Sequence, residues 1–245
     1  MSGSVTLKPV SSAPIEDAVV TMMKGAVGAH VGLLYRADHE GTRRHLHLAD
    51  HFSLRDDLTA PSDAFWVVPG LDEFALADVR ASARLIARRH EDGRVPYAFR
   101  QADARFDETG TLRLNQSLGL TCSTFVRLVF ARAGVELVDA ETWDLGRSAE
   151  RRREDEAAQS RLVSYLRRRP DAQQHAERVE QEIGCTRIRA EETAVASGMK
   201  GHPISFARAE PQGRHVLGVV LGQIASGLSR STPEGHEEHE VSPPA

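Results

Sequence analysis

The sequence predicts an α+β protein in which an antiparallel sheet packs on one cysteine-bearing helix and a mainly helical C-terminal extension follows. Three observations favour this class. Short apolar or alternating segments, typical of strands, occupy much of residues 29–68. A helix with a buried apolar stripe is expected to begin beside Cys122. From Ser148 onward the composition shifts to dense charge with helical spacing.

The first two predicted strands form a hairpin that carries three histidines. Residues 29–35 (AHVGLLY) are apolar and closed by polar residues, with His30 at the start. Residues 43–52 alternate in polarity, so His45 and His47 share one face while leucines take the other. The hairpin could therefore bring the rings of His30 and His47 to the same side.

A third strand and a long helix come next. Residues 64–68 (AFWVV) are apolar and end at a Pro-Gly pair, which favours a strand followed by a turn. Residues 72–89 carry apolar side chains at near-helical spacing, with arginines toward the end where the helix dipole favours cations.

The most informative segment surrounds Cys122. Thr121 is a good N-cap residue, and Gly134 stands where a helix of about twelve residues would stop. Cys122 thereby falls in the first turn of the predicted helix. The stripe expected to be buried consists of Phe125, Val126, Val129, Phe130 and Ala133.

The C-terminal part predicts two charged helices and a hairpin. One helix runs through Leu166 and is broken at Pro170, and a second covers about 171–183. Residues 203–209 and 215–222, separated by Pro-Gln-Gly, are expected to pair as strands. These pieces are sparsely apolar, so we expect them to pack on the preceding domain.

Composition restricts the partners. A formal net charge of −4 over 245 residues gives no general attraction to phosphate backbones, so nucleic acid is not the expected partner. No run reaches the roughly 18 to 20 apolar residues of a membrane span, and no signal segment begins the chain. The expected compartment is the cytoplasm, and secretion that needs no cleavable signal stays an alternative.

The chain has two cysteines, Cys122 and Cys185. Two cysteines make no disulfide framework, and the C-x-x-C spacing of a structural zinc site is missing, so we expect no metal and no cofactor. Cys185 follows a charged helix beside a glycine and is interpreted as structural.

A cysteine in the first turn of a buried helix meets the positive end of the helix dipole and free backbone N–H groups, which favour the thiolate. Cys122 is therefore a candidate nucleophile, and its own N–H could donate to an oxyanion. The alternative is a small buried apolar residue. A thiol hydrolase also needs a base and a group that orients it, for which His30 and His47 are candidates. His45 is the alternative to His47 as the orienting residue, and either histidine could instead be half-exposed and without a catalytic role.

Three segments together resemble a known family. The segments HVGLLY (30–35), LHLA (46–49) and TCSTFV (121–126), in this order, resemble the permuted branch of the NlpC/P60 superfamily, which includes lecithin:retinol acyltransferase-like and YiiX-type proteins. The resemblance covers roughly residues 20–143. It implies a circularly permuted papain-like fold, with His30 as general base, His47 as the orienting residue and Cys122 as nucleophile.

The resemblance also suggests groups on the substrate or oxyanion side. Tyr97, in Val-Pro-Tyr, is similar to a Pro-Tyr element that precedes the cysteine in the superfamily, although its spacing to Cys122 is long and a packing role is equally open. Thr121 is the second such candidate. Ser123-Thr124 stands where many unpermuted members have Ser-Gly.

The expected organisation and function follow. We expect a flexible arm (1–14), a permuted papain-like catalytic domain (15–147), a charged helical and hairpin extension (148–227) and a disordered acidic tail (228–245). The predicted activity is hydrolysis of an amide bond, peptide or isopeptide, through a thioacyl-enzyme, with a peptide-like or acyl substrate. The alternatives are a lipid acyltransferase or thioesterase, a non-catalytic binding module, and a toxin-like effector. No pattern indicates the oligomeric state.

Overall fold

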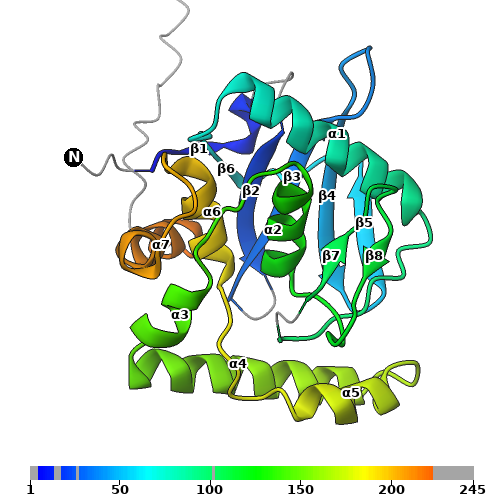
Figure 1. The fold of residues 1–245 in the computed structure, drawn as a ribbon, viewed down its shortest axis with the longest axis vertical. Helices are drawn as coiled ribbons and strands as arrows, with labels where there is room; N and C mark the ends of the chain where they lie inside the picture. Colours follow the sequence, from blue (N-terminus) through cyan, green and yellow to red (C-terminus); the bar gives the residue numbers. More distant parts are fainter. Residues whose placement is uncertain (1–4, 14–17, 26–27, 101–102, 223–245) are drawn as a thin grey trace, which may run out of the picture.

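A six-stranded antiparallel sheet forms the N-terminal part of the protein, and a mainly helical region follows it (Figure 1). The computed structural model describes residues 5–13, 18–25, 28–100 and 103–222. The strands of the sheet lie in the order β1-β6-β2-β3-β4-β5. Their bounds are β1 Leu7–Pro9, β2 Val19–Gly25, β3 Gly28–Arg36, β4 Arg43–Asp50, β5 Ser53–Asp57 and β6 Phe65–Val67.

The remaining elements are one small hairpin, one short 3-10 helix and seven α-helices in the described part of the chain. The hairpin consists of β7 Arg105–Phe106 and β8 Leu112–Arg113, and the 3-10 helix is Val10–Ser12. The α-helices are α1 Glu73–Arg89, α2 Cys122–Arg132, α3 Glu141–Gly146, α4 Ala149–Arg167, α5 Gln173–Glu180, α6 Ala190–Gly198 and α7 Phe206–Val220. No described helix combines the length and apolar character that a membrane crossing requires.

The strands and helices around the predicted site are confirmed. The hairpin of β3 and β4 pairs Leu33 with Leu46, so both leucines face the core. The helix expected at 72–89 is α1, and the Asp72 side chain caps it by accepting a hydrogen bond from the Ala75 N–H. The charged helices expected before and after Pro170 are α4 and α5.

Part of the predicted flexible arm is ordered, which corrects that prediction. Residues 7–9 form β1, the edge strand, which pairs Leu7 with Val67. Pro9 is compatible with this position because an edge strand can leave one side unpaired. Strand β2 was also missed: it is buried throughout residues 19–23, so it lacks the alternation that marks a half-exposed strand. The predicted acidic tail, 228–245, lies outside the described residues.

The predicted hairpin at 203–222 is wrong, because these residues form the helix α7. The Pro-Gln-Gly segment suggested a turn, yet Pro211 lies inside the helix. The apolar side chains explain the outcome: Phe206, Ala209 and Val216 are spaced to share one helical face, and all three enter the main core. Tertiary burial thus outweighs the local turn signal.

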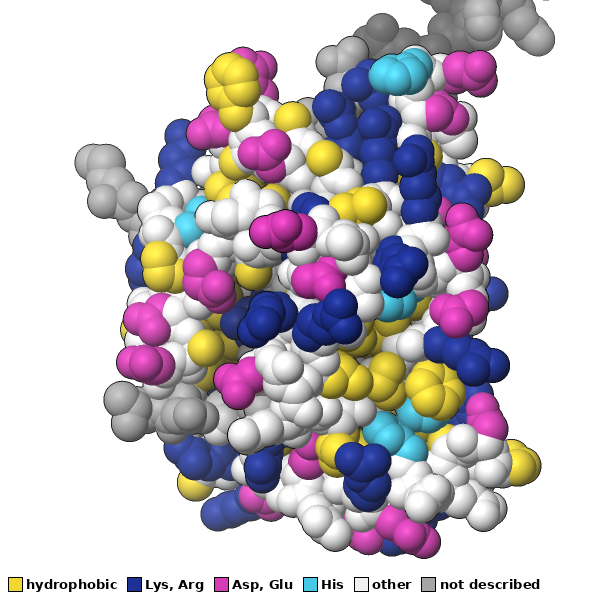
Figure 2. Space-filling view, turned by 45° about the vertical axis from the view of Figure 1, so that its right-hand side comes forward, with side chains coloured by type: hydrophobic (Ala, Val, Ile, Leu, Met, Phe, Trp, Pro, Cys, Tyr) yellow, Lys and Arg dark blue, Asp and Glu magenta, His cyan; other side chains and the backbone are white. Residues whose placement is uncertain are grey.

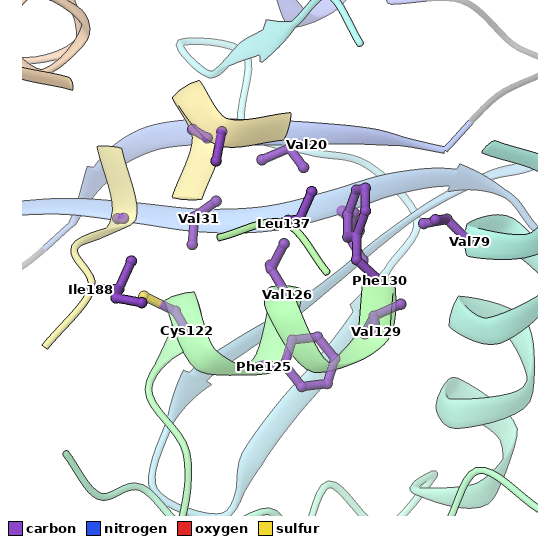
Figure 3. Close-up of a cluster of buried hydrophobic side chains, with 14 of the residues drawn as sticks. Val20, Val31, Val79, Cys122, Phe125, Val126, Val129, Phe130, Leu137 and Ile188 are labelled. Carbon is purple, nitrogen blue, oxygen red and sulfur yellow. The ribbon is translucent and has the colours of Figure 1, made fainter. Parts of the chain in front are cut away.

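Helix α2 packs its apolar stripe on the core face of the sheet. Phe125, Val126 and Phe130 are fully or almost fully buried. Figure 3 shows Cys122 in the first turn of this helix, with Val31 of β3 and Ile188 beside it. The cysteine therefore belongs to the packed main core.

The hairpin of α4 and α5 forms a separate layer across the end of the sheet at which α2 begins (Figure 1). A small apolar cluster holds the two helices together, with Phe99 from the preceding loop. The members from the helical hairpin are Val163, Leu166, Ala172, Ala176 and Val179. The region in front of Cys122 is thus covered by a helical hairpin that begins only at Ala149, well after the cysteine in the chain.

A buried ionic cluster joins α3, α4 and α6. The Glu192 carboxylate accepts hydrogen bonds of 2.8 Å from the Trp143 indole, the Arg147 guanidinium and the Arg189 backbone N–H. Burial alone would raise the pKa of Glu192, but these donors, above all Arg147, hold it below the usual range. A buried guanidinium left without its carboxylate is strongly destabilising.

Glu192→Ala is therefore expected to lower the free energy of unfolding by about 3–5 kcal/mol, because it leaves Arg147 buried without its main partner. Chemical denaturation would measure the change. Glu177→Ala, at an exposed position of α5, is the matched control and should change stability by about 0.5 kcal/mol or less. Equal stability of the two variants would show that the cluster contributes no net stability.

Candidate active site

Cys122 lies at the start of α2, where the Thr121 side chain caps the helix. The Thr121 hydroxyl accepts a hydrogen bond of 3.0 Å from the Thr124 N–H. Burial raises the pKa of Cys122, but the charge and hydrogen bond of His30 and a bond from the Val31 N–H outweigh it and lower the pKa to about 7. The lowered pKa favours the thiolate near neutral pH, and the thiolate is the form that reacts.

His30 contacts the sulfur from β3. Burial lowers the pKa of His30, but the neighbouring Cys122 thiolate and its hydrogen bond outweigh this, so the net shift is upward. The other side of the ring is occupied, because His30 Nε2 lies 2.9 Å from His47 Nδ1. Nδ1 is therefore the ring nitrogen that His30 can present to the sulfur.

Asp57, on β5, fixes the proton positions of both rings. Its Oδ2 lies 3.1 Å from His47 Nε2, and an ionised carboxylate can only accept a hydrogen bond. His47 therefore carries its proton on Nε2, and its Nδ1 accepts from the His30 Nε2–H. Neutral His30 then has an unprotonated Nδ1, which is the state required to take the thiol proton.

His45 takes no part in this chain of hydrogen bonds. Its ring stacks on His47 with centroids 4.6 Å apart, and its Nε2 lies 2.8 Å from the Thr21 hydroxyl. Burial, followed by the charges of His47 and His30, lowers the pKa of His45 to about 3, so the ring stays neutral. Between the two histidines that the sequence left open, His47 is the one that contacts His30.

Gly32 provides the space in which these rings lie. A Cβ at this position would stand 2.6 Å from His45 Nε2 and 2.8 Å from His47 Cβ. Both separations are far below van der Waals contact. A side chain of any size here would force the two rings away from the sheet.

Gly32→Ala is expected to lower kcat/KM by about tenfold or more, because displacing a catalytic group by roughly 1 Å slows the reaction strongly. It should also lower the free energy of unfolding by about 1–3 kcal/mol, because the added methyl group overpacks the site. Steady-state kinetics and chemical denaturation would measure both. Gly213→Ala is the control, since a Cβ there has its nearest neighbour at 3.5 Å. Unchanged kinetics in the Gly32 variant would show that the ring positions are not required.

The two predicted candidates for the oxyanion side differ in position. The Tyr97 hydroxyl meets the backbone N–H of Cys122, and burial followed by the Cys122 charge raises its pKa. Tyr97 thus stays protonated and lines the pocket in front of the sulfur. The Thr121 hydroxyl is engaged with Thr124, so it serves as the helix cap.

His45, His47 and Asp57 also form the group in the described chain that could hold a metal ion, with potential ligand atoms within 4.8 Å of one another. Two imidazoles and a carboxylate suit a transition metal. A cation at this place would have to displace the hydrogen bond between His47 and Asp57. His47 and Asp57 therefore satisfy each other, and the Thr21 hydroxyl satisfies His45 Nε2.

A pocket of about 670 Å³ opens in front of the sulfur. Its floor is made by Cys122, His30 and Tyr97, and its opposite wall by α4. Asp50 at its rim accepts hydrogen bonds from the Tyr165 hydroxyl, at 2.6 Å, and from Arg169, at 2.8 Å. These two bonds connect the helical hairpin to the end of β4.

The structure thus brings together Cys122, His30 and His47, while Cys185 is partly buried elsewhere, with its pKa raised by burial to about 11. Sequence reasoning missed Asp57. Its signal was weak, since no strand was predicted between residues 52 and 64, although the register places Asp57 opposite His45. It also missed that α4 walls the pocket, because this contact joins distant parts of the chain.

Comparison of the chain with protein-family models, with curated proteins and with solved structures finds no match.

Proposed function

We propose that this protein is a cysteine hydrolase that cleaves an amide bond through a thioacyl-enzyme intermediate. The observation that carries the proposal is the contact between Cys122 and His30, because it joins a thiol of lowered pKa to a base whose proton position is set by His47 and Asp57. A nucleophile, its base and an orienting group within hydrogen-bond reach are the signature of covalent catalysis.

The reaction follows from these positions. His30 Nδ1 takes the proton of Cys122, and the thiolate attacks the carbonyl carbon, forming a C–S bond. The negative charge develops on the carbonyl oxygen, to which the Tyr97 hydroxyl can donate a hydrogen bond while it accepts one from the Cys122 N–H. When the C–N bond breaks, the amine leaves with the proton held by His30. Water then attacks the thioester, gives its proton to His30, and releases the acid and the free thiol.

The permuted papain-like fold is part of the same proposal. Its support is the chain order, in which the strand that bears the histidine precedes the helix that bears the cysteine. It is also supported by the packing of α2 on β3 and β4. The third residue, His47, lies on the strand adjacent to that of His30.

The test is to trap the acyl-enzyme. Incubation with an activated ester should add the mass of one acyl group to the intact protein, and peptide mapping should place it on Cys122. Cys122→Ala should acquire no acyl group, while Cys185→Ala should acquire it at the wild-type rate. Acylation of another residue, or none with any ester or amide of a panel, would contradict the proposal.

A further inference from the structure

Positive charge predominates among the described side chains that line the pocket in front of Cys122. Three arginines line it: Arg161 from α4, Arg168 directly after α4, and Arg187 from the segment before α6. Asp50 is the acidic residue among its lining, and it is already paired with Arg169. Among the described residues, no carboxylate forms an ion pair with any of the three lining arginines.

The three arginines border the pocket from two segments of the chain. Arg161, Tyr165 and Arg168 follow one another at four and three residues, so they share the face of α4 and its C-cap that lines the pocket. Arg187 is half-buried, its Nε is shielded from solvent without a hydrogen-bond partner, and its charge acts on both Cys122 and Tyr97. A shielded guanidinium nitrogen needs an acceptor, and the described residues provide none for Arg187 Nε.

We infer that this pocket selects an anionic substrate, namely a peptide-like amide that carries a carboxylate close to the scissile bond. This inference rests on the proposed function, because the arginines act on whatever Cys122 attacks. Guanidinium groups match carboxylates in geometry and charge. A second cavity shares Arg161 and Arg187 with the first, but three carboxylates also line it, and each lies within ion-pair distance of Arg189 (Glu154, Asp155 and Glu191). The carboxylate of the substrate is therefore expected in the first pocket, in front of the sulfur.

Another group of cations lies elsewhere and must be kept apart in any test. Figure 2 shows Lys and Arg side chains gathered at the top of the face it displays. On α1 and the end of β3, Arg84 lies among Arg80, Arg36 and Arg88; burial and then these charges lower the pKa of Arg84. Because anions could also gather there, the readout has to be a reaction at Cys122 itself.

Alkylation of the intact protein by a neutral and an anionic reagent provides that readout. In both cases the Cys122 thiolate displaces iodide from a CH₂–I group, and only the carboxylate of iodoacetate differs from iodoacetamide. The ratio of the two rates cancels any change in thiolate fraction. We expect the iodoacetate-to-iodoacetamide rate ratio at Cys122 to be about tenfold higher than the same ratio at Cys185. In about 0.5 M NaCl, the ratio at Cys122 should fall toward the ratio at Cys185.

Substitutions identify the residues. Arg161→Gln and Arg187→Gln should each lower the iodoacetate-to-iodoacetamide ratio by about threefold or more. Arg153→Gln, at an exposed position of the same helix outside the pocket, should leave it unchanged. Iodoacetamide that reacts no faster at Cys122 than at Cys185 would contradict the proposed function. If iodoacetamide reacts fast with Cys122 but iodoacetate shows no preference for Cys122, only the inferred selection of an anionic substrate would be overturned.

Protection of Cys122 from iodoacetamide distinguishes the classes of anion. A short Glu-containing peptide should protect the thiol better than its Gln counterpart, and Arg187→Gln should remove the difference. Equal protection by the two peptides would overturn the inference. Protection by glycerophosphate alone would also overturn it, because it would indicate a phosphate ligand in place of a carboxylate.

Discussion

Replacing Cys122 by alanine is expected to lower turnover of an amide substrate by about 10⁴-fold or more, because the pocket offers no second nucleophile beside a base. The hydroxyls of Ser160 and Ser164, which also line it, donate to backbone carbonyls of their own helix. Tyr97 stays protonated, so its hydroxyl does not replace the thiolate as nucleophile. His30 loses the Cys122 thiolate, which stabilises the protonated form of its ring. Water attack assisted by the remaining groups would leave only a small residual rate. Steady-state hydrolysis of a chromogenic amide would measure the loss.

Folding has to be separated from chemistry in this experiment. Cys122 is 6% exposed and packs in the main core, so removal of its sulfur is expected to cost about 1 kcal/mol in stability. Cys122→Ser keeps the shape and is the second variant, with a hydroxyl that is a far weaker nucleophile near neutral pH. Cys185→Ala is the control. Wild-type turnover in both Cys122 variants would exclude the sulfur from the reaction.

The sequence predicts the strands and the helix around the site because each has a local signal. Alternation along residues 43–50 places His45 and His47 on one face, and the N-cap at Thr121 locates the cysteine in a first turn. Both signals involve only neighbours along the chain or across one hairpin, and the hairpin suffices to bring His47 beside His30. The contact between Cys122 and His30 joins distant residues, and it was implied only by the family resemblance.

The parts that the sequence did not predict depend on contacts between distant residues. Asp57 acquires its role only through the register of β5 against β4, and the wall formed by α4 only through a helical hairpin that crosses the sheet end. The helix α7 replaces an expected hairpin because its apolar face is buried in the main core. In each case tertiary packing determines the structure, and local propensity carries no information about such packing.

His30→Asn is expected to reduce kcat/KM by about 10³-fold or more, because an amide side chain can still donate to His47 but cannot accept the thiol proton. The same change should alter the titration of Cys122. Burial raises the pKa of this thiol, and the largest opposing influence is the charge and hydrogen bond of His30. Without them, the pKa should rise from about 7 toward or above that of an ordinary thiol.

The pH dependence follows with a definite sign. In the wild type, alkylation of Cys122 by iodoacetamide should rise through about pH 7 as the thiolate forms, and turnover should rise with it. Since the pKa of His30 is raised, turnover should fall again at higher pH, where the imidazolium that protonates the leaving amine is lost. The variant should lose the reaction with iodoacetamide at about pH 6 and show its alkylation curve displaced to higher pH.

His39→Ala, at an exposed position of the β3–β4 turn, is the matched control and should retain both curves. The pair of measurements separates two roles that kinetics alone would confuse. A ring that only supports the local structure would lower turnover without moving the alkylation curve of Cys122. If the ring shares its proton with the sulfur, its removal must shift the alkylation curve, because loss of the imidazolium changes the free energy of the thiolate directly. An unchanged curve in His30→Asn would therefore exclude the thiolate–imidazolium pair.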